Sequence, residues 1–162
     1  MKTKNYLLPN QFKKMGWGLF ILTTLFAIYY LCYDQEPAMF DLKAFALFRG
    51  DLFLGPGERS YFTFIDDNIG NEIIGVFGII ACLFIAFSKE TYEDELVAKI
   101  RLDSLLWATY CNYIILLFTV IFIYGLPFFW VLVFNMYTTL VVFIIRFNWM
   151  NYKFKKSMSN EE

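Results

Sequence analysis

The chain has 162 residues and a formal net charge of −1, and 59% of its residues are hydrophobic and 22% aromatic. It is therefore far more apolar than an ordinary soluble domain. The sequence contains no His, which excludes bis-histidine haem and the metal sites and proton relays that depend on an imidazole.

The apolar residues are gathered in blocks roughly as long as the ~20 residues that an α-helix needs to cross the hydrocarbon core. Inside lipid the backbone must satisfy its own hydrogen bonds, so such blocks fold as helices. The sequence predicts an all-α integral membrane protein, a four-transmembrane-helix bundle forming a single membrane domain. The predicted spans cover residues 15–33, 70–88, 104–124 and 127–146.

The first apolar run follows a basic segment, residues 1–14. It is too long for the hydrophobic region of a signal peptide, and no small-residue cleavage site follows it. We therefore expect a retained transmembrane helix.

The outer loop, residues 34–69, is unusually rich in Phe and Leu. Leu42, Phe45, Phe48 and Leu52 recur at helical spacing, and the acidic neighbours of Pro37 suit the start of a helix. These features predict a short amphipathic helix at the outer interface or capping the bundle. Residues 61–68 alternate ring and polar side chains, which also fits a short strand.

The second span carries small residues at intervals of four, Gly78, Cys82 and Ala86. Small side chains at this spacing let another helix approach closely. Packing within one bundle is the favoured interpretation, and a dimerisation face is the alternative.

A charged segment, residues 89–103, continues without a helix breaker into the third span. Thr91 stands three residues before Asp94, as in a capping box. Glu95, Lys99 and Asp103 follow at intervals of four, so opposite charges can pair along one face. The segment is either the solvated start of the third span or a surface that docks a soluble partner.

The third and fourth spans form a hairpin around Gly125 and Pro127. Counting outward from Leu126 places Asn112 level with Thr139, and Asn135 level with a point near Leu117, within about a turn of Thr119. Hydrogen bonds between such polar groups fix helix register. We interpret them as packing contacts in preference to a substrate pocket.

Arg146 lies at the inner end of the fourth span, within about one turn of the depth of Asp103. The sequence predicts that the two pair at the cytoplasmic rim. The alternative is that Arg146 extends to lipid phosphate.

Charge distribution predicts the topology. A cytoplasmic amino terminus places eleven of the fourteen Lys and Arg residues inside and leaves only Lys43, Arg49 and Arg59 outside, which satisfies the positive-inside rule. Both termini are then cytoplasmic.

Sequence motifs of known catalytic sites are absent, and no ionisable residue lies near the centre of a predicted span. We therefore predict no catalytic residue, no cofactor and no metal site. The acidic residues Asp66, Asp67 and Glu72 leave open a membrane enzyme that uses carboxylates at the rim.

The segment E-D-E-L-V-A-K-I-R-L-D-S-L-L-W-A-T-Y-C-N-Y, followed by V-F-N-M-Y-T and I-I-R-F-N, resembles small four-span inner-membrane proteins of bacteria that have no assigned activity. The resemblance covers about residues 88–148. Some of these proteins are encoded beside small helix-turn-helix regulators. The resemblance implies a bacterial inner-membrane location and an accessory or regulatory role.

The leading functional prediction is a non-enzymatic accessory or regulatory membrane subunit. Its expected partners are the lipid bilayer and either another protein or further copies of itself, with no direct contact to nucleic acid. A lipid- or small-molecule-handling protein with a pocket near the outer loop is the alternative.

Overall fold

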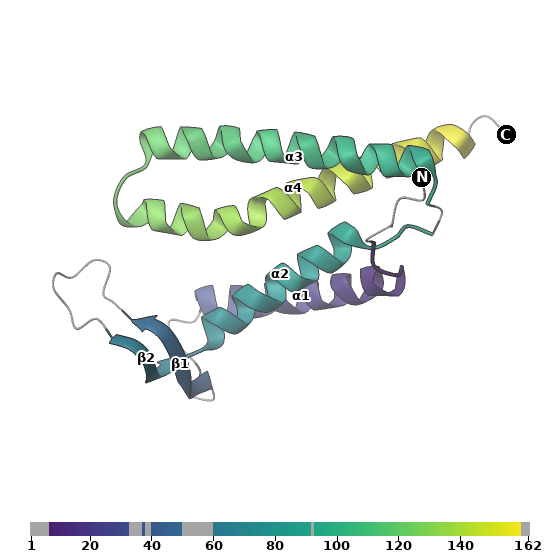
Figure 1. Cartoon of the computed structure of the whole chain (residues 1–162). Helices are drawn as coiled ribbons and strands as arrows, with labels where there is room; N and C mark the ends of the chain where they lie inside the picture. The colour runs from purple at the N-terminus through teal and green to yellow at the C-terminus, as the bar shows by residue number, and fades with distance from the viewer. Residues whose placement is uncertain (1–6, 33–36, 38–39, 50–59, 92, 160–162) are drawn as a thin grey trace. The chain divides into compact units, whose positions relative to one another are not determined.

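The computed structural model describes residues 7–32, 37, 40–49, 60–91 and 93–159. Its elements follow in the order α1 (Gln11–Cys32), β1 (Asp41–Arg49), β2 (Ser60–Asn68), α2 (Gly70–Phe87), α3 (Glu95–Phe122) and α4 (Leu126–Ser159) (Figure 1). The chain divides into two compact units. Residues 21–78 form one, and residues 1–20 together with 79–162 form the other.

Most of the described chain is helical, and three of its helices are long and apolar enough to cross a membrane. These segments are Gly70–Phe87, Glu95–Phe122 and Leu126–Met158. The predicted first span also folds as a helix, α1, of 22 residues. That α1 makes a fourth crossing remains a prediction.

The outer loop corrects the sequence analysis, because residues 41–49 form the strand β1 and not an amphipathic helix. β1 pairs antiparallel with β2, with Phe45 opposite Phe64. β2 is rich in the aromatic and β-branched residues that favour strands. Pairing with β2 gives the backbone of β1 its hydrogen bonds, which the helical spacing of Leu42, Phe45 and Phe48 did not reveal. Residues 50–59 lie outside the described residues.

α3 and α4 lie side by side as an antiparallel hairpin (Figure 1). α3 ends at its C-cap, Ile123, and Gly125 then adopts a φ of +75°. This left-handed conformation favours glycine. Pro127 stands in the first turn of α4, where a missing N–H costs little. α4 continues through 34 residues to Ser159, so the basic tail is helical as far as that residue.

The core of the larger unit forms where α2, α3 and α4 meet. Its fully buried members include Cys82, Ala86, Ala108, Phe143 and Phe147. Cys82 and Ala86 are thus covered within the chain, as the packing interpretation of the small residues expects. Gly78 is also buried and belongs to the other unit.

Two asparagines join α3 to α4 inside the apolar hairpin. Asn135 Nδ2 donates to Asn112 Oδ1 over 3.0 Å. The depth count had instead placed Asn112 beside Thr139. It was centred on Leu126, whereas α3 already ends at Phe122, and this earlier end moves the centre of the hairpin toward α3.

We expect Asn135→Leu to destabilise the hairpin by about 1–2 kcal/mol, because hydrogen bonds between transmembrane helices are worth about 0.6–2 kcal/mol. Asn112→Leu should cost a similar amount. The double variant should cost less than the sum of the two, since the bond is already lost in either single variant. Unfolding titrations of all four proteins in mixed micelles measure this coupling. Fully additive effects would contradict it.

Candidate functional site

Arg101, on the buried face of α3, is the centre of a polar cluster in the larger unit. Its side chain is 10% exposed. Nη2 donates to both carboxylate oxygens of Glu93 over 3.0 and 2.9 Å, and Nη1 donates to the carbonyl oxygens of Ser88 (3.0 Å) and Ala86 (3.3 Å). The guanidinium also lies 4.7 Å above the ring of Phe147. Arg101 therefore joins the end of α2, the linker and α4.

A second carboxylate in the linker, Glu90, joins the amino-terminal segment to the same place. Its side chain is 7% exposed and forms an ion pair with Lys13. Lys155 of α4 approaches its other oxygen at 4.0 Å, and Lys13 Nζ lies 3.3 Å from Asn148 Oδ1. We call the ion pairs of Glu90 and Glu93 with their basic partners the rim joint.

Backbone hydrogen bonds reinforce the rim joint. Leu8 forms a parallel β-bridge with Ser88, through Leu8 N to Phe87 O (2.9 Å) and Lys89 N to Leu8 O (2.8 Å). The linker between α2 and α3 is thereby held on one side by the amino-terminal segment and on the other by Arg101.

α3 begins one turn later than the capping-box interpretation placed it. Asp94 is the N-cap, and its side chain accepts from Val97 N over 2.8 Å. Thr91 instead accepts a hydrogen bond from Asn10 Nδ2 at 3.3 Å. Asp94 caps more effectively than Thr91 would, because its carboxylate also interacts favourably with the helix dipole. The charged segment and the third span nevertheless form a single continuous helix from Glu95.

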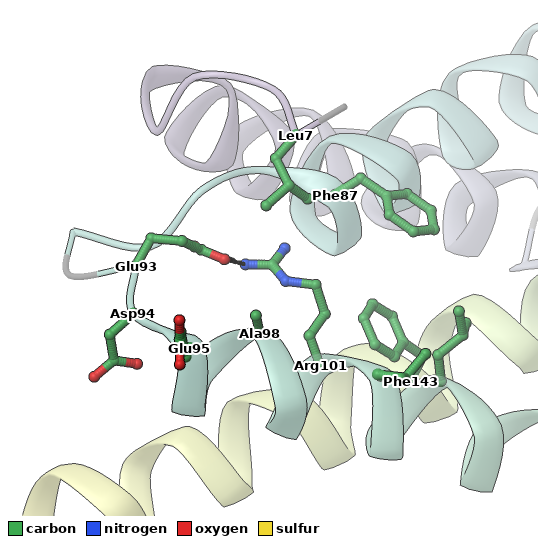
Figure 2. A pocket seen from close by; sticks show the side chains of 10 residues that line it. Leu7, Phe87, Glu93, Asp94, Glu95, Ala98, Arg101 and Phe143 are labelled. Atoms are coloured by element: carbon green, nitrogen blue, oxygen red, sulfur yellow. Dashed lines mark hydrogen bonds and ion pairs between the residues drawn. The ribbon is translucent and has the colours of Figure 1, made fainter. Parts of the chain in front are cut away.

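A pocket of about 550 Å³ lies against the rim joint (Figure 2). Its apolar walls include Phe87, Leu105 and Phe143, and its polar side contains Glu93, Asp94, Glu95 and Arg101. Figure 2 shows Arg101 directed toward Glu93 between the apolar walls. Among the acidic side chains of the lining, Glu93 pairs with Arg101 and Asp94 caps α3, whereas Glu95 has neither an ion pair nor a side-chain hydrogen bond among the described residues. This arrangement suits a joint that holds helices together better than it suits a reaction centre.

The charged side chains that were predicted to pair along α3 are not within ion-pair distance of one another. Glu95, Lys99 and Asp103 are exposed, and the described residues include no ion pair for any of them. At intervals of four on an exposed face, these side chains remain hydrated, and such pairs are worth only about 0.3–0.5 kcal/mol.

Arg146 and Asp103 form no ion pair within the described chain either. The Arg146 guanidinium lies 4.4 Å above the Trp107 ring, and its buried Nε has no hydrogen-bond partner there. Trp107 follows Asp103 by four residues on the same face of α3. The planar guanidinium stacks on the indole, a contact available to Arg at a helix surface.

From the sequence, Arg101 is predicted only to be one of the inner positive charges, and its pairing with Glu93 is not predicted. The signal was its position on the helix face that also carries Val97, Ser104 and Ala108, four residues before it and three and seven after it. All four are buried. A basic residue on a face of small and apolar residues predicts a buried cation, and a buried cation requires a carboxylate partner.

The remaining acidic candidates are dispersed. Asp66 and Glu72 are exposed, and Asp67 accepts from the Asn68 backbone N–H at 2.9 Å. The described residues contain no group of three or more His, Cys, Asp or Glu side chains arranged to hold a metal ion. Comparison of the chain with protein-family models, curated proteins and solved structures gave no match.

Proposed function

We propose that this protein is a non-enzymatic accessory or regulatory membrane subunit that binds another protein through the beginning of α3. The docking face consists of Glu95, Leu96, Lys99, Leu102 and Asp103. The proposal includes four membrane crossings, cytoplasmic termini and a bacterial inner-membrane location.

The observation that carries the proposal is the exposure of two leucines on a charged, firmly held segment. Leu96 is 55% exposed and Leu102 58%. The charges of Glu95, Lys99 and Asp103 keep this part of α3 out of the hydrocarbon, so lipid tails do not cover the two leucines. Exposed apolar side chains among charges are typical of a protein interface.

The geometry of α3 separates the docking face from the rim joint. Val97, Arg101 and Ser104 point inward and are buried, while the docking face points away from them at 3.6-residue spacing. Because the buried side is locked by Arg101, the exposed side is preorganised, which lowers the entropic cost of binding. Glu95 and Leu102 also line the pocket, so a partner's apolar or basic side chain can enter beside them.

A photo-crosslinking amino acid in place of Leu96 or Leu102 tests the proposal in native membranes. We expect one adduct of defined mass from each position, and loss of both adducts when Lys99→Glu is added. Met158 of α4, 55% exposed, is the matched control position and should give no such adduct. Reaction with lipid alone at positions 96 and 102 would refute the docking face, and an adduct of twice the chain mass would identify the partner as a second copy.

The topology is tested separately. Reporter fusions after residue 162 should show cytoplasmic activity, and a reporter inserted between residues 49 and 60 should show activity on the opposite side. A reporter between 49 and 60 that is active in the cytoplasm would contradict the crossing by α1.

A further inference from the structure

The strand pair carries four large apolar side chains on one of its faces. Side chains alternate along a strand, so Phe45 and Leu47 of β1 share a face with Phe62 and Phe64 of β2, as the Phe45–Phe64 pairing requires. They are 54%, 65%, 72% and 71% exposed, in that order. We call these four side chains the aromatic face.

The aromatic face is ordered by contacts among its own rings. The centroids of Phe45 and Phe64 lie 5.3 Å apart, and those of Phe45 and Phe62 lie 6.5 Å apart. Phe62 has a φ of +53°, a strained conformation for a bulky residue. This strained residue is also the most exposed of the four, which is unfavourable for a surface in contact with water.

Asn68 fixes the base of the strand pair to the helices. It is 8% exposed. Its Oδ1 accepts from the Tyr30 hydroxyl and from Gly70 N, both over 3.1 Å, and its Nδ2 donates to Asp41 Oδ1 (2.8 Å) and Pro37 O (3.1 Å). All the hydrogen-bonding capacity of this amide is therefore engaged. It ties β1 and β2 to the end of α1 and the beginning of α2.

We call these hydrogen bonds of Asn68 the anchor. The anchor limits how far the aromatic face can lie from a bilayer that α2 crosses. β2 ends at Asn68, and α2, which is long and apolar enough to cross a membrane, begins at Gly70. Phe64 is only four residues before Asn68, about 13 Å of strand. If α2 crosses the membrane, the strand pair starts at the headgroup level and its polar base, Asp41 with Asn68, lies there.

We propose that the aromatic face lies against the phospholipid bilayer and buries its rings at the boundary between headgroups and acyl chains. Aromatic side chains favour this level, and shallow insertion of an apolar face needs only about 5–10 Å of depth. Lys43 and Asp66, which face each other across the strands on the same side, stay among the headgroups. The strand pair is thus a membrane contact in addition to the membrane-crossing helices. It is independent of the docking face on α3, which binds a protein.

A bilayer explains the aromatic face better than a protein partner does. The hydrogen bonds of Asn68 keep the aromatic face close to the beginning of α2, a helix long and apolar enough to cross a membrane, in every copy of the protein.

The test uses the full-length protein in nanodiscs of phosphatidylethanolamine and phosphatidylglycerol. A fluorescent amino acid replaces Leu47 or Phe64, and Tyr61, 63% exposed on the opposite face, is the matched control. We expect nitroxide-labelled lipid to quench positions 47 and 64 several-fold more than aqueous iodide does, and the reverse at position 61.

Quenching of positions 47 and 64 mainly by iodide would overturn the proposal, because the aromatic face would then lie in water. Protection from both quenchers would also overturn it and would indicate a covering protein or second copy. Adding Asn68→Ala provides a further measurement. Loss of the anchor should reduce lipid quenching at position 64 at least two-fold while lipid quenching of the combined emission of the four native tryptophans is unchanged. Equal quenching with and without Asn68 would refute the role of the anchor.

Discussion

Arg101→Met is expected to destabilise the protein more than any other single change that retains side-chain volume. The substitution leaves Glu93 without its cation and leaves the carbonyl oxygens of Ala86 and Ser88 without a donor. Breaking a buried ion pair by removing one partner costs about 3–5 kcal/mol. With Cys32 (exposed) and Cys111 (partly buried) replaced by Ser, Cys82, 0% exposed, provides the measurement, since a thiol-reactive dye then labels this one thiol only as the larger unit opens on heating.

Three variants distinguish the rim joint from a general loss of packing. Arg101→Lys should recover only part of the stability, because an ammonium group cannot bond both oxygens of Glu93 in the planar geometry of a guanidinium. Glu93→Gln should partly rescue Arg101→Met by removing the unpaired charge. Lys153→Met, at a basic residue that stacks on the exposed Trp149, should change stability by less than about 0.5 kcal/mol. An Arg101→Met protein that labels at the same temperature as the parent would contradict the account.

Gly16→Ala is expected to disturb the packing of α1 on α2. A Cβ at Gly16 would lie 2.9 Å from Phe84 Cβ, 3.0 Å from Ile85 Cγ1 and 3.1 Å from Ile85 N. Backbone and Cβ atoms cannot rotate away, so the helices must move apart. Overpacking of this kind costs about 1–3 kcal/mol, which exceeds the gain of about 1 kcal/mol that Ala brings to a helix interior.

Gly18→Ala is the matched control in the same helix, two residues further on. Its Cβ would meet nothing within 4 Å, so only the helix-propensity gain remains and stability should be unchanged or slightly higher. Thermal labelling of Cys82 compares the two variants directly. A Gly18→Ala protein less stable than Gly16→Ala would show that the helices pack differently from the structure.

The helices were predictable because their signal is local. Long apolar runs specify helices wherever the backbone must bond itself, and the boundaries of α2 and the continuity of α3 followed from that rule. A hydrogen bond between polar side chains of α3 and α4 was predictable, but the pairing of Asn112 with Asn135 was not predicted. Its partner choice depends on where α3 ends, and a difference of a few residues changes which side chains face each other.

The strand pair and the rim joint were not predictable in the same way, because each depends on residues distant in the sequence. β1 has helical spacing in isolation and becomes a strand only when β2 supplies hydrogen bonds. Arg101 finds Glu93 because the linker folds back beside Ser88. Depth along the helix could not predict the partner of Arg146, because Trp107 and Asp103 lie only one turn apart on the same helix.

The bridge between Leu8 and Ser88 also imposes an order on biosynthesis. Asn10 and Thr91, joined beside it, are 81 residues apart. At about 5–20 residues per second, the amino-terminal segment waits about 4–16 s on the ribosome for these partners. During that interval Glu90 has not been synthesised, so Lys13 has not yet met the carboxylate with which it pairs. The proposed orientation of α1, with its amino terminus in the cytoplasm, would therefore be set while Lys13 is still unpaired, and the ion pair with Glu90 forms only afterwards, when the linker is complete.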